Sequence, residues 1–180
     1  SPASVDVNQS STTTVTVTDD DASGTKSFPT GTVGVVSDSG DTITGTCTLA
    51  SSATPGVSTC QVTVTPTHAS VHTITATFTA TTIHSGSSGN NGFSVGTRHT
   101  TTTVGFSPAS VDVNQSTTAT VTVTDDDANG TKSFPSGTIG VVSDSGDTIT
   151  GTCTLANSAT PGVSTCQVTV TPTHASVHKI

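Results

Sequence analysis

The sequence predicts an all-β protein in which one antiparallel sandwich of short strands is repeated end to end. Three observations predict this architecture. Thr, Ser and Val dominate the 180 residues, whereas Trp, Tyr, Met and Glu are absent, and β-branched side chains suit half-buried strands better than helices. Apolar residues alternate with polar ones in short runs, which is the period of a strand with one buried face. Most of the sequence also occurs twice.

The internal repeat sets the domain organisation. Residues 1–74 return as residues 107–180 at an offset of 106, without a gap, and seven of these 74 paired positions differ. Copies this similar favour a recent duplication inside an array. We therefore predict two domains, residues 1–98 and residues 99–180, arranged end to end.

Each predicted strand is marked by apolar residues two positions apart, and turn signals such as NQS, SDSGD and TPTHAS separate the strands. In chain order, the residues expected to face inward are Val15 and Val17; Val33 and Val35; Ile43, Cys47 and Leu49; Cys60, Val62 and Val64; Ile74, Ala76, Phe78 and Ala80; Phe93 and Val95; and, opening the second copy, Val104, Phe106, Val111 and Val113. The segment HSGSSGNNG is expected to be a turn. About seven short antiparallel strands per repeat are typical of an immunoglobulin-like β-sandwich.

The four cysteines form two equivalent pairs, Cys47 with Cys60 and Cys153 with Cys166. Neither pair has the CxxC spacing of zinc or redox sites. We expect one disulfide per repeat and hence an oxidising, extracellular or cell-surface location. The phase of the strands predicts that each disulfide joins the fourth and fifth strands rather than one sheet to the other. The alternative is a pair of free buried thiols in a cytosolic protein.

Charge excludes some classes of partner. The net charge is −8, because 12 Asp face only four basic residues. Nucleic acid needs a basic surface, anionic membranes attract basic segments that are missing here, and no stretch is apolar enough to cross a bilayer. We therefore expect no nucleic-acid partner and no direct membrane insertion, whereas an acidic surface suits cations.

The motif words VTVTD…PTGTV, CTL…CQVTVTP and HTITATF…HSGSSG resemble the bacterial Ig-like repeats of large prokaryotic cell-surface and adhesin-type proteins. The resemblance spans the whole chain. It departs from the family pattern at DDD, where many relatives have one Asp, and at TATT, where many have Tyr-Ser-Gly-Asp. The resemblance implies a spacer role in adhesins, stalks or surface filaments and says little about a ligand.

A family domain begins at the strand TTTTVGFSPASVDV. On that basis the first copy lacks the start of its first strand, and the second lacks everything after its sixth strand begins. We expect the sequence to be a window of a longer tandem array, whose partners are further copies of the same repeat in the chain or filament. Lateral self-association of such arrays through Thr-rich faces is a second expectation.

Asp-rich turns suggest a metal site. With an odd number of strands per repeat, the lower pole of one repeat should face the upper pole of the next. The candidate calcium ligands at this joint are Asp6, Asp38, Asp41, Asp125, Asp126 and Asp127. Ca²⁺ takes six to eight oxygen ligands and would relieve repulsion between facing carboxylates. The alternative is that these Asp lie in solvated turns, which they favour, and no cofactor is required by the fold.

His68 and His72 could ligate zinc, or could be a turn and a strand-edge histidine.

Three asparagines, Asn8, Asn114 and Asn129, fit the N-glycosylation pattern in predicted surface turns.

No catalytic residues are predicted, because without Glu an asymmetric acid–base pair would need two Asp in contrasting environments. We therefore expect a structural segment of an extracellular filament, stalk or adhesin, and not an enzyme. The alternative is an adhesion module that recognises a host or glycan target through its polar loops, although stacking platforms of Trp and Tyr are absent.

Overall fold

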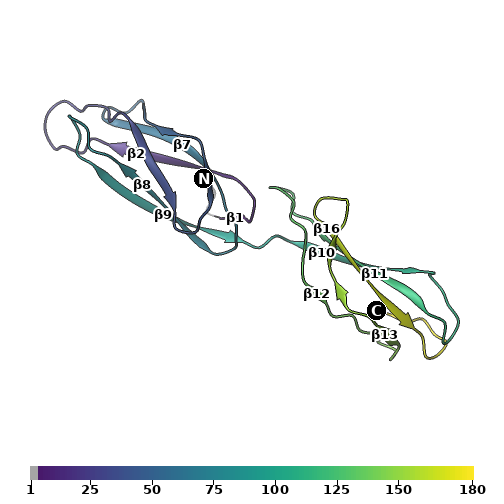
Figure 1. Ribbon diagram of the computed structural model, residues 1–180. Coiled ribbons are helices and arrows are strands. Elements are labelled where there is room, and N and C mark those ends of the chain that lie inside the picture. The colour runs from purple at the N-terminus through teal and green to yellow at the C-terminus, as the bar shows by residue number, and fades with distance from the viewer. Residues whose placement is uncertain (1–3) are drawn as a thin grey trace. The chain divides into compact units, whose positions relative to one another are not determined.

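A computed structural model describes residues 4–180, and the first three residues of the predicted opening strand lie outside that range. Every regular element within it is a β-strand, and the described chain has no helix long and apolar enough to cross a membrane. The chain divides into two compact units, Ser1–Thr97 and Arg98–Ile180. Figure 1 shows the strands of each unit, which we describe separately.

The first unit contains a five-stranded and a four-stranded sheet. The larger sheet has the order β1 (Ser4–Asp6), β9 (Ser87–Gly96), β8 (Val71–Phe78), β3 (Thr32–Ser37) and β5 (Cys47–Thr48). The smaller sheet has the order β2 (Ser11–Thr18), β7 (Val57–Thr65) and β4 (Thr42–Thr44), and β6 (Ala50–Ser51) also pairs with β7.

Alternation builds one core from both sheets of the first unit. Val15 and Val17 of β2 and Val62 and Val64 of β7 are buried, while Thr16, which lies between the two valines of β2, is exposed. From the larger sheet the core receives Val33, Cys47, Ile74 and Phe78. The predicted in-facing phase is therefore correct for these strands, but Ala80 is exposed and lies beyond the end of β8.

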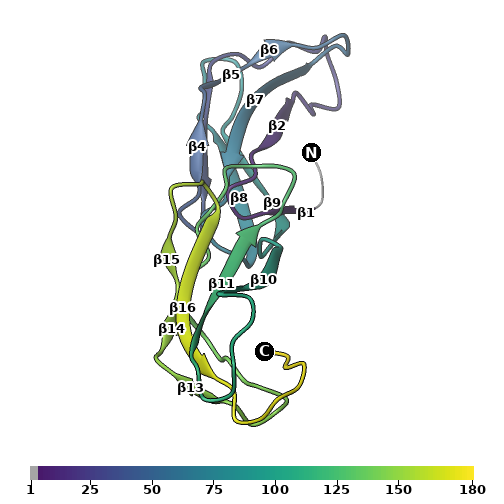
Figure 2. The ribbon, with the colours of Figure 1, turned by 90° about the vertical axis from the view of Figure 1, so that its right-hand side faces the viewer.

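The predicted strand through Ile43, Cys47 and Leu49 is not continuous. It divides into β4, β5 and β6, which pair in turn with β7, with β3 and again with β7 (Figure 2). The chain thus leaves one sheet, joins the other and returns within ten residues. Gly45 makes the first change of direction possible, because it adopts a φ of 94°, which side chains disfavour.

This change of sheet corrects the predicted position of the disulfide. Cys47 lies in β5 of the larger sheet, and Cys60 lies in β7 of the smaller sheet. The Cys47–Cys60 disulfide therefore joins the two sheets, rather than two successive strands of one sheet. Both cysteines are buried in the core that the two sheets share.

Two further predictions about the first unit are wrong. β1 pairs in parallel with β9, whereas all strands were expected to be antiparallel. The expected turn HSGSSGNNG is largely strand, because β9 begins at Ser87 and pairs with β8 along its length. The residues of β9 before Phe93 are exposed. They pair with β8 through their backbone, and such pairing does not need the apolar alternation from which strands were predicted.

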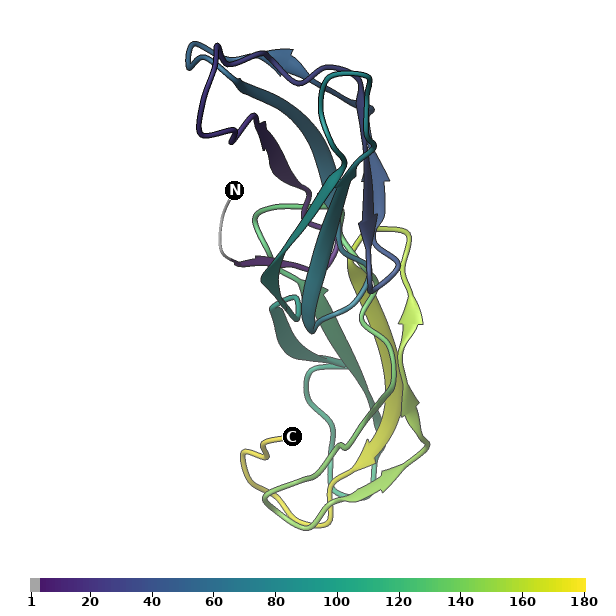
Figure 3. The same cartoon turned by 90° about the vertical axis from the view of Figure 1, so that its left-hand side faces the viewer.

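The second unit repeats part of this arrangement (Figures 1 and 3). Its main sheet has the order β10 (Thr100–Ser107), β11 (Thr117–Asp125), β16 (Val163–Thr171) and β13 (Thr148–Thr150), with β15 (Ala156–Asn157) also on β16. A second sheet holds β12 (Thr138–Ile139) and β14 (Cys153–Thr154). The Cys153–Cys166 disulfide again connects the two sheets.

Within the described residues of the second unit, nothing after β16 forms a strand, including 177–180, which correspond to the start of β8. β12 accordingly has two residues where β3 has six, because β8 is the long-range partner of β3 in the first unit. Val111 was predicted to lie in a strand and lies outside any strand. Its counterpart Val5 lies in β1, which pairs with β9, and the described residues of the second unit contain no strand that corresponds to β9. Val104 and Phe106 of β10 were expected to face inward and remain 39% and 36% exposed.

Candidate functional site: buried ion pairs and acidic loops

A buried, hydrogen-bonded histidine–aspartate pair joins two elements of the first unit. Nδ1 of His72, in β8, lies 2.7 and 2.9 Å from the two carboxylate oxygens of Asp41, in the turn before β4. Both side chains have an exposed fraction of 0%. The hydroxyl of Ser37 donates a hydrogen bond to Asp41 Oδ2 at 2.7 Å. The pair therefore fastens the turn after β3 to the start of β8.

The surroundings of His72 differ from the strand-edge setting that the sequence predicted as one alternative. The histidine is fully enclosed rather than at a strand edge, and its ring centroid lies 4.7 Å from that of His68 and 5.6 Å from that of Phe93. Its Nδ1 is engaged by Asp41, and its Nε2 is buried without a hydrogen-bond partner within the described structure. His68 and His72 do not belong to a cluster of three or more metal-ligating groups among residues 4–180.

The second unit has the equivalent ion pair. His178 Nδ1 lies 2.6 and 2.7 Å from the carboxylate oxygens of Asp147, and Ser143 donates to that carboxylate. The hydrogen bond to Asp147 raises the pKa of His178 above its ordinary value, against the effect of burial. Burial alone would raise the pKa of Asp147, but hydrogen bonds from Ser143 and His178 outweigh it and lower that pKa.

The acidic loop after β2 is organised by Asp19. Its Oδ2 accepts the backbone N–H of Ser27 at 2.8 Å, which holds the pKa of Asp19 below its ordinary value. The Ser27 hydroxyl contacts both Asp19 and, at 2.8 Å, Nε2 of His84 in the loop between β8 and β9. Sequence reasoning did not bring these residues together, because 57 positions separate Ser27 from His84.

Ser27, His84 and Asp19 do not have the order of a catalytic triad. Asp19 approaches Nε2 of His84, at 3.9 Å, which is the nitrogen that faces Ser27. In a triad the carboxylate orients the imidazole from the opposite nitrogen. Asp19 also lies 3.2 Å from the Ser27 hydroxyl, where its negative charge would oppose an oxyanion.

In the second unit an arginine joins the equivalent loop. Arg98 Nε lies 2.5 Å and its Nη2 3.1 Å from the carboxylate of Asp125, and both side chains are almost fully buried. Burial acts to raise the pKa of Asp125, but the guanidinium and the N–H groups of Ser133 and Asp127 hold it well below the ordinary value. His99 binds Asp127 through its backbone N–H and its ring Nδ1, at 3.0 and 2.8 Å.

The six Asp predicted as calcium ligands all lie in turns or at strand ends, where most have protein donors. Within the first unit, the backbone N–H of Thr73 donates to Asp38, Asp41 binds His72, and Asp6 ends β1. Within the second unit, Asp125 binds Arg98, Asp127 binds His99, and the Thr101 hydroxyl donates to Asp126. Calcium binding by these residues stays a prediction.

The three candidate glycosylation asparagines lie in turns. Asn8 and Asn114 both adopt a φ of 64°, and their backbone N–H groups donate to the carbonyl oxygens of Pro66 and Pro172. Asn129 is exposed, and its carbonyl accepts a hydrogen bond from Arg98. Their modification stays a prediction.

Comparison with known proteins gives no family. No protein-family model matches the chain, and neither the curated proteins nor the solved structures contain a match. What is established is an all-β chain of several sheets and two disulfides, which favour an oxidising environment.

Proposed function

We propose that the chain is a structural segment of an extracellular or cell-surface filament, stalk or adhesin, built from tandem immunoglobulin-like domains. The observation that carries this proposal is the repetition of cross-links at an offset of 106. Each unit has an inter-sheet disulfide and a His–Asp pair between a turn and a distant segment. Each also has an aspartate, Asp19 or Asp125, whose carboxylate accepts the backbone N–H of a serine later in the same loop. A dedicated binding or catalytic site does not need duplication, whereas a spacer does.

The strand order supports immunoglobulin-like sandwiches. A constant-type immunoglobulin domain has strands ABED in one sheet and CFG in the other. The sheet β10-β11-β16-β13 corresponds to the order ABED, and the run β3-β8-β9 of the first unit corresponds to CFG. The disulfide differs from that of antibody domains, which joins strands B and F, because here it joins the E-like β7 to the short β5.

The parallel pairing of β1 with β9 suits a protein under tension. β1 lies near the amino end of the first unit and β9 near its carboxyl end. Pulling these ends apart slides two parallel strands past each other, so that their three residue pairs resist together instead of opening one after another. The inter-sheet disulfide then limits extension if the sheets separate.

Single-molecule pulling tests this function. The full chain, tethered at its two ends, should give a distinct force peak for the first unit under oxidising conditions. The disulfide shields the residues between Cys47 and Cys60, a sequence separation of 13 with a Cα–Cα distance of 5.0 Å. At about 3.4 Å per residue, reduction should lengthen the released contour by about 40 Å.

The matched control is the Cys47→Ser, Cys60→Ser variant. The contour released by its first unit should equal that of the first unit in the reduced wild type and should not respond to reductant, whereas its second unit, with Cys153–Cys166, should still respond. Extension without a force peak under oxidising conditions would contradict a mechanical role.

A further inference from the structure

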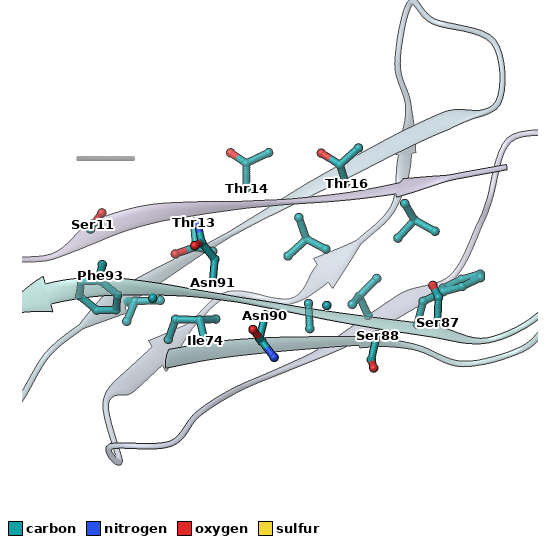
Figure 4. Close-up of a pocket in the computed structure, with 18 residues that line it drawn as sticks. Ser11, Thr13, Thr14, Thr16, Ile74, Ser87, Ser88, Asn90, Asn91 and Phe93 are labelled. Atoms are coloured by element: carbon teal, nitrogen blue, oxygen red, sulfur yellow. The ribbon is translucent and has the colours of Figure 1, made fainter. Parts of the chain in front are cut away.

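Charge in this protein is concentrated in the loops and at the ends of strands, where all 12 Asp and all four basic residues lie. The groove between β2 and the strands β8 and β9 of the first unit shows the contrast. Ser, Thr, Asn, Gly and apolar residues line it, and none of the described residues around it is charged (Figure 4). Ion pairs can therefore form only between loops and strand ends, and several of them meet where the chain enters the second unit.

The segment at which the chain enters the second unit is held by three consecutive carboxylates. This entry segment, residues 98–101, follows the boundary between the units and leads into β10. The aspartate triplet, Asp125–Asp127, lies at the end of β11 and in the loop after it. Each of its three side chains accepts a hydrogen bond from the entry segment. The segment is therefore bound at several successive residues.

Arg98 makes the most buried of these contacts. Its Nε and Nη2 donate to the two carboxylate oxygens of Asp125 at 2.5 and 3.1 Å, which is the bidentate geometry of a strong, directional ion pair. Nη2 also donates to the backbone carbonyl oxygen of Asn129 at 3.1 Å. Arginine is seldom fully buried unless it is paired, and the side chain of Arg98 has an exposed fraction of only 5%. The pairing therefore accounts for the enclosure of this guanidinium.

The residues that follow Arg98 are held by the rest of the triplet. His99 donates its backbone N–H to Asp127 at 3.0 Å, and its ring Nδ1 lies 2.8 Å from the same carboxylate. The Thr101 hydroxyl donates to Asp126, whose backbone N–H donates to the carbonyl oxygen of His99 at 3.1 Å. The peptide bond between Arg98 and His99 thus lies in a stretch that one loop fixes through both side chains and backbone.

The triplet is itself fixed by residues of its own loop. The backbone N–H of Ser133 donates to Asp125 Oδ2 at 2.8 Å. Nζ of Lys132 donates to the backbone carbonyl oxygens of Asp125, at 3.0 Å, and of Asp127. The loop therefore holds the carboxylates in place, so that little conformational freedom is lost when the entry segment closes on them.

We propose that the aspartate triplet is a latch that closes on the entry segment and protects the peptide bond after Arg98 from proteases. Segments between domains are ordinarily exposed and flexible, and such places are preferred sites of proteolytic nicking. Arg98 is the only arginine of the 180 residues and lies at the boundary between the units. A protease that cuts after arginine must bind this side chain, so the latch has to open before cleavage.

The advantage of such a latch to an extracellular fibre rests on the proposed function. The latch itself rests only on contacts within the second unit, and its test needs neither a filament nor an applied force. Its failure would therefore leave the pulling result intact.

Digestion of the folded, full chain by an arginine-specific protease tests the latch. With a single arginine, cleavage gives only residues 1–98 and 99–180, which mass spectrometry resolves. The synthetic peptide SVGTRHTTTT, residues 94–103, is the unprotected reference. The chain should be cut at least about tenfold more slowly than the peptide, since hydrogen bonds to a charged group must break first. Equal rates would overturn the proposal.

The Asp125→Asn variant should raise the rate of cleavage of the chain by about tenfold, because the arginine loses its charged partner. Asp112→Asn is the matched control, since it makes the same change of charge at an exposed position of the same unit and should leave the rate unchanged. Equal acceleration in both variants, or none in Asp125→Asn, would contradict the latch.

Unfolding of the whole second unit would also expose Arg98, so it is measured separately. Hydrogen exchange of residues 163–171 reports it, because β16 is not paired with β10. Faster cleavage with unchanged exchange supports the latch. If Asp125→Asn also speeds this exchange, Thr101→Val decides, because it changes an exposed position and removes the hydroxyl that donates to Asp126. Faster cleavage of that variant at unchanged exchange then supports the latch, and an unchanged rate overturns it.

Discussion

Removing the carboxylate of Asp41 should destabilise the first unit strongly. In Asp41→Asn, the amide cannot accept hydrogen bonds from both His72 and Ser37 through two oxygens, as the carboxylate does at 2.7–2.9 Å. His72 would remain fully buried, with its Nε2 already lacking a partner within the described chain. The substitution therefore leaves a second polar atom of the same ring poorly satisfied.

The size of the effect follows from the burial of both partners, each with an exposed fraction of 0%. Losing a hydrogen bond to a charged group costs about 1.5–3 kcal/mol. The upper end of this range, about 3 kcal/mol, applies here because neither side chain is exposed. For a small domain with an m-value of about 1 kcal/mol/M, the urea midpoint should fall by about 3 M.

Urea unfolding followed by hydrogen exchange measures the free energy of unfolding of each unit separately, because residues 71–78 report on the first unit and residues 117–125 on the second. Only the first unit should lose stability. Asp38→Asn is the matched control, since Asp38 lies in the same turn but is exposed. A loss below about 1 kcal/mol in Asp41→Asn, or an equal loss in the control, would refute the reasoning.

Four further predictions address the disulfide, the sheet change, pH and metal. Replacing both cysteines of the first unit with alanine should lower its free energy of unfolding by about 3 kcal/mol in urea titration, as a loop of this size predicts. Gly45→Ala should cost about 1–2 kcal/mol in the same assay, because φ is 94° there, whereas Gly89→Ala, at an open position without positive φ, should cost less. In the second unit, the raised pKa of His178 gives stability that is complete below pH 6.5 and is lost as pH rises through the folded-state pKa; the lowered pKa of Asp147 gives stability present above pH 3.8 and lost as pH falls. The melting temperature of that unit should therefore be greatest between these pH values, and His178→Gln should remove the alkaline decline; an unchanged decline would contradict this assignment. Calcium binding predicts a higher melting temperature with calcium than with chelator, and equal values would reject it.

Local periodicity was enough to predict which residues of most strands are buried. Val15, Val17, Val62 and Val64 face the core because the side chains of a strand alternate with a period of two, a property of the backbone alone. The pairing partners of the strands were less predictable. The parallel pairing of β1 with β9 depends on residues about 90 positions apart in the chain, and no local pattern reports it.

The candidate site, like the fold, could be predicted only in part from the sequence. The recurrence of the cysteines was enough to predict the two disulfides, but not that they cross between sheets, because Gly45 alone does not reveal that the chain changes sheet there. The recurrence of Asp41 and His72 as Asp147 and His178 was also visible in the sequence. Spacing of 31 residues does not identify a histidine–aspartate pair, however, and only the folded turn brings the two side chains together.

We propose that this chain forms part of a fibre outside the cell. Immunogold labelling of intact source cells, with antibodies raised against the folded chain, tests it most directly. For such a fibre, gold particles should lie along extracellular filaments or stalks, at intervals that reflect repeated copies of the epitope. Label confined to the interior of permeabilised cells, with none on intact ones, would contradict it.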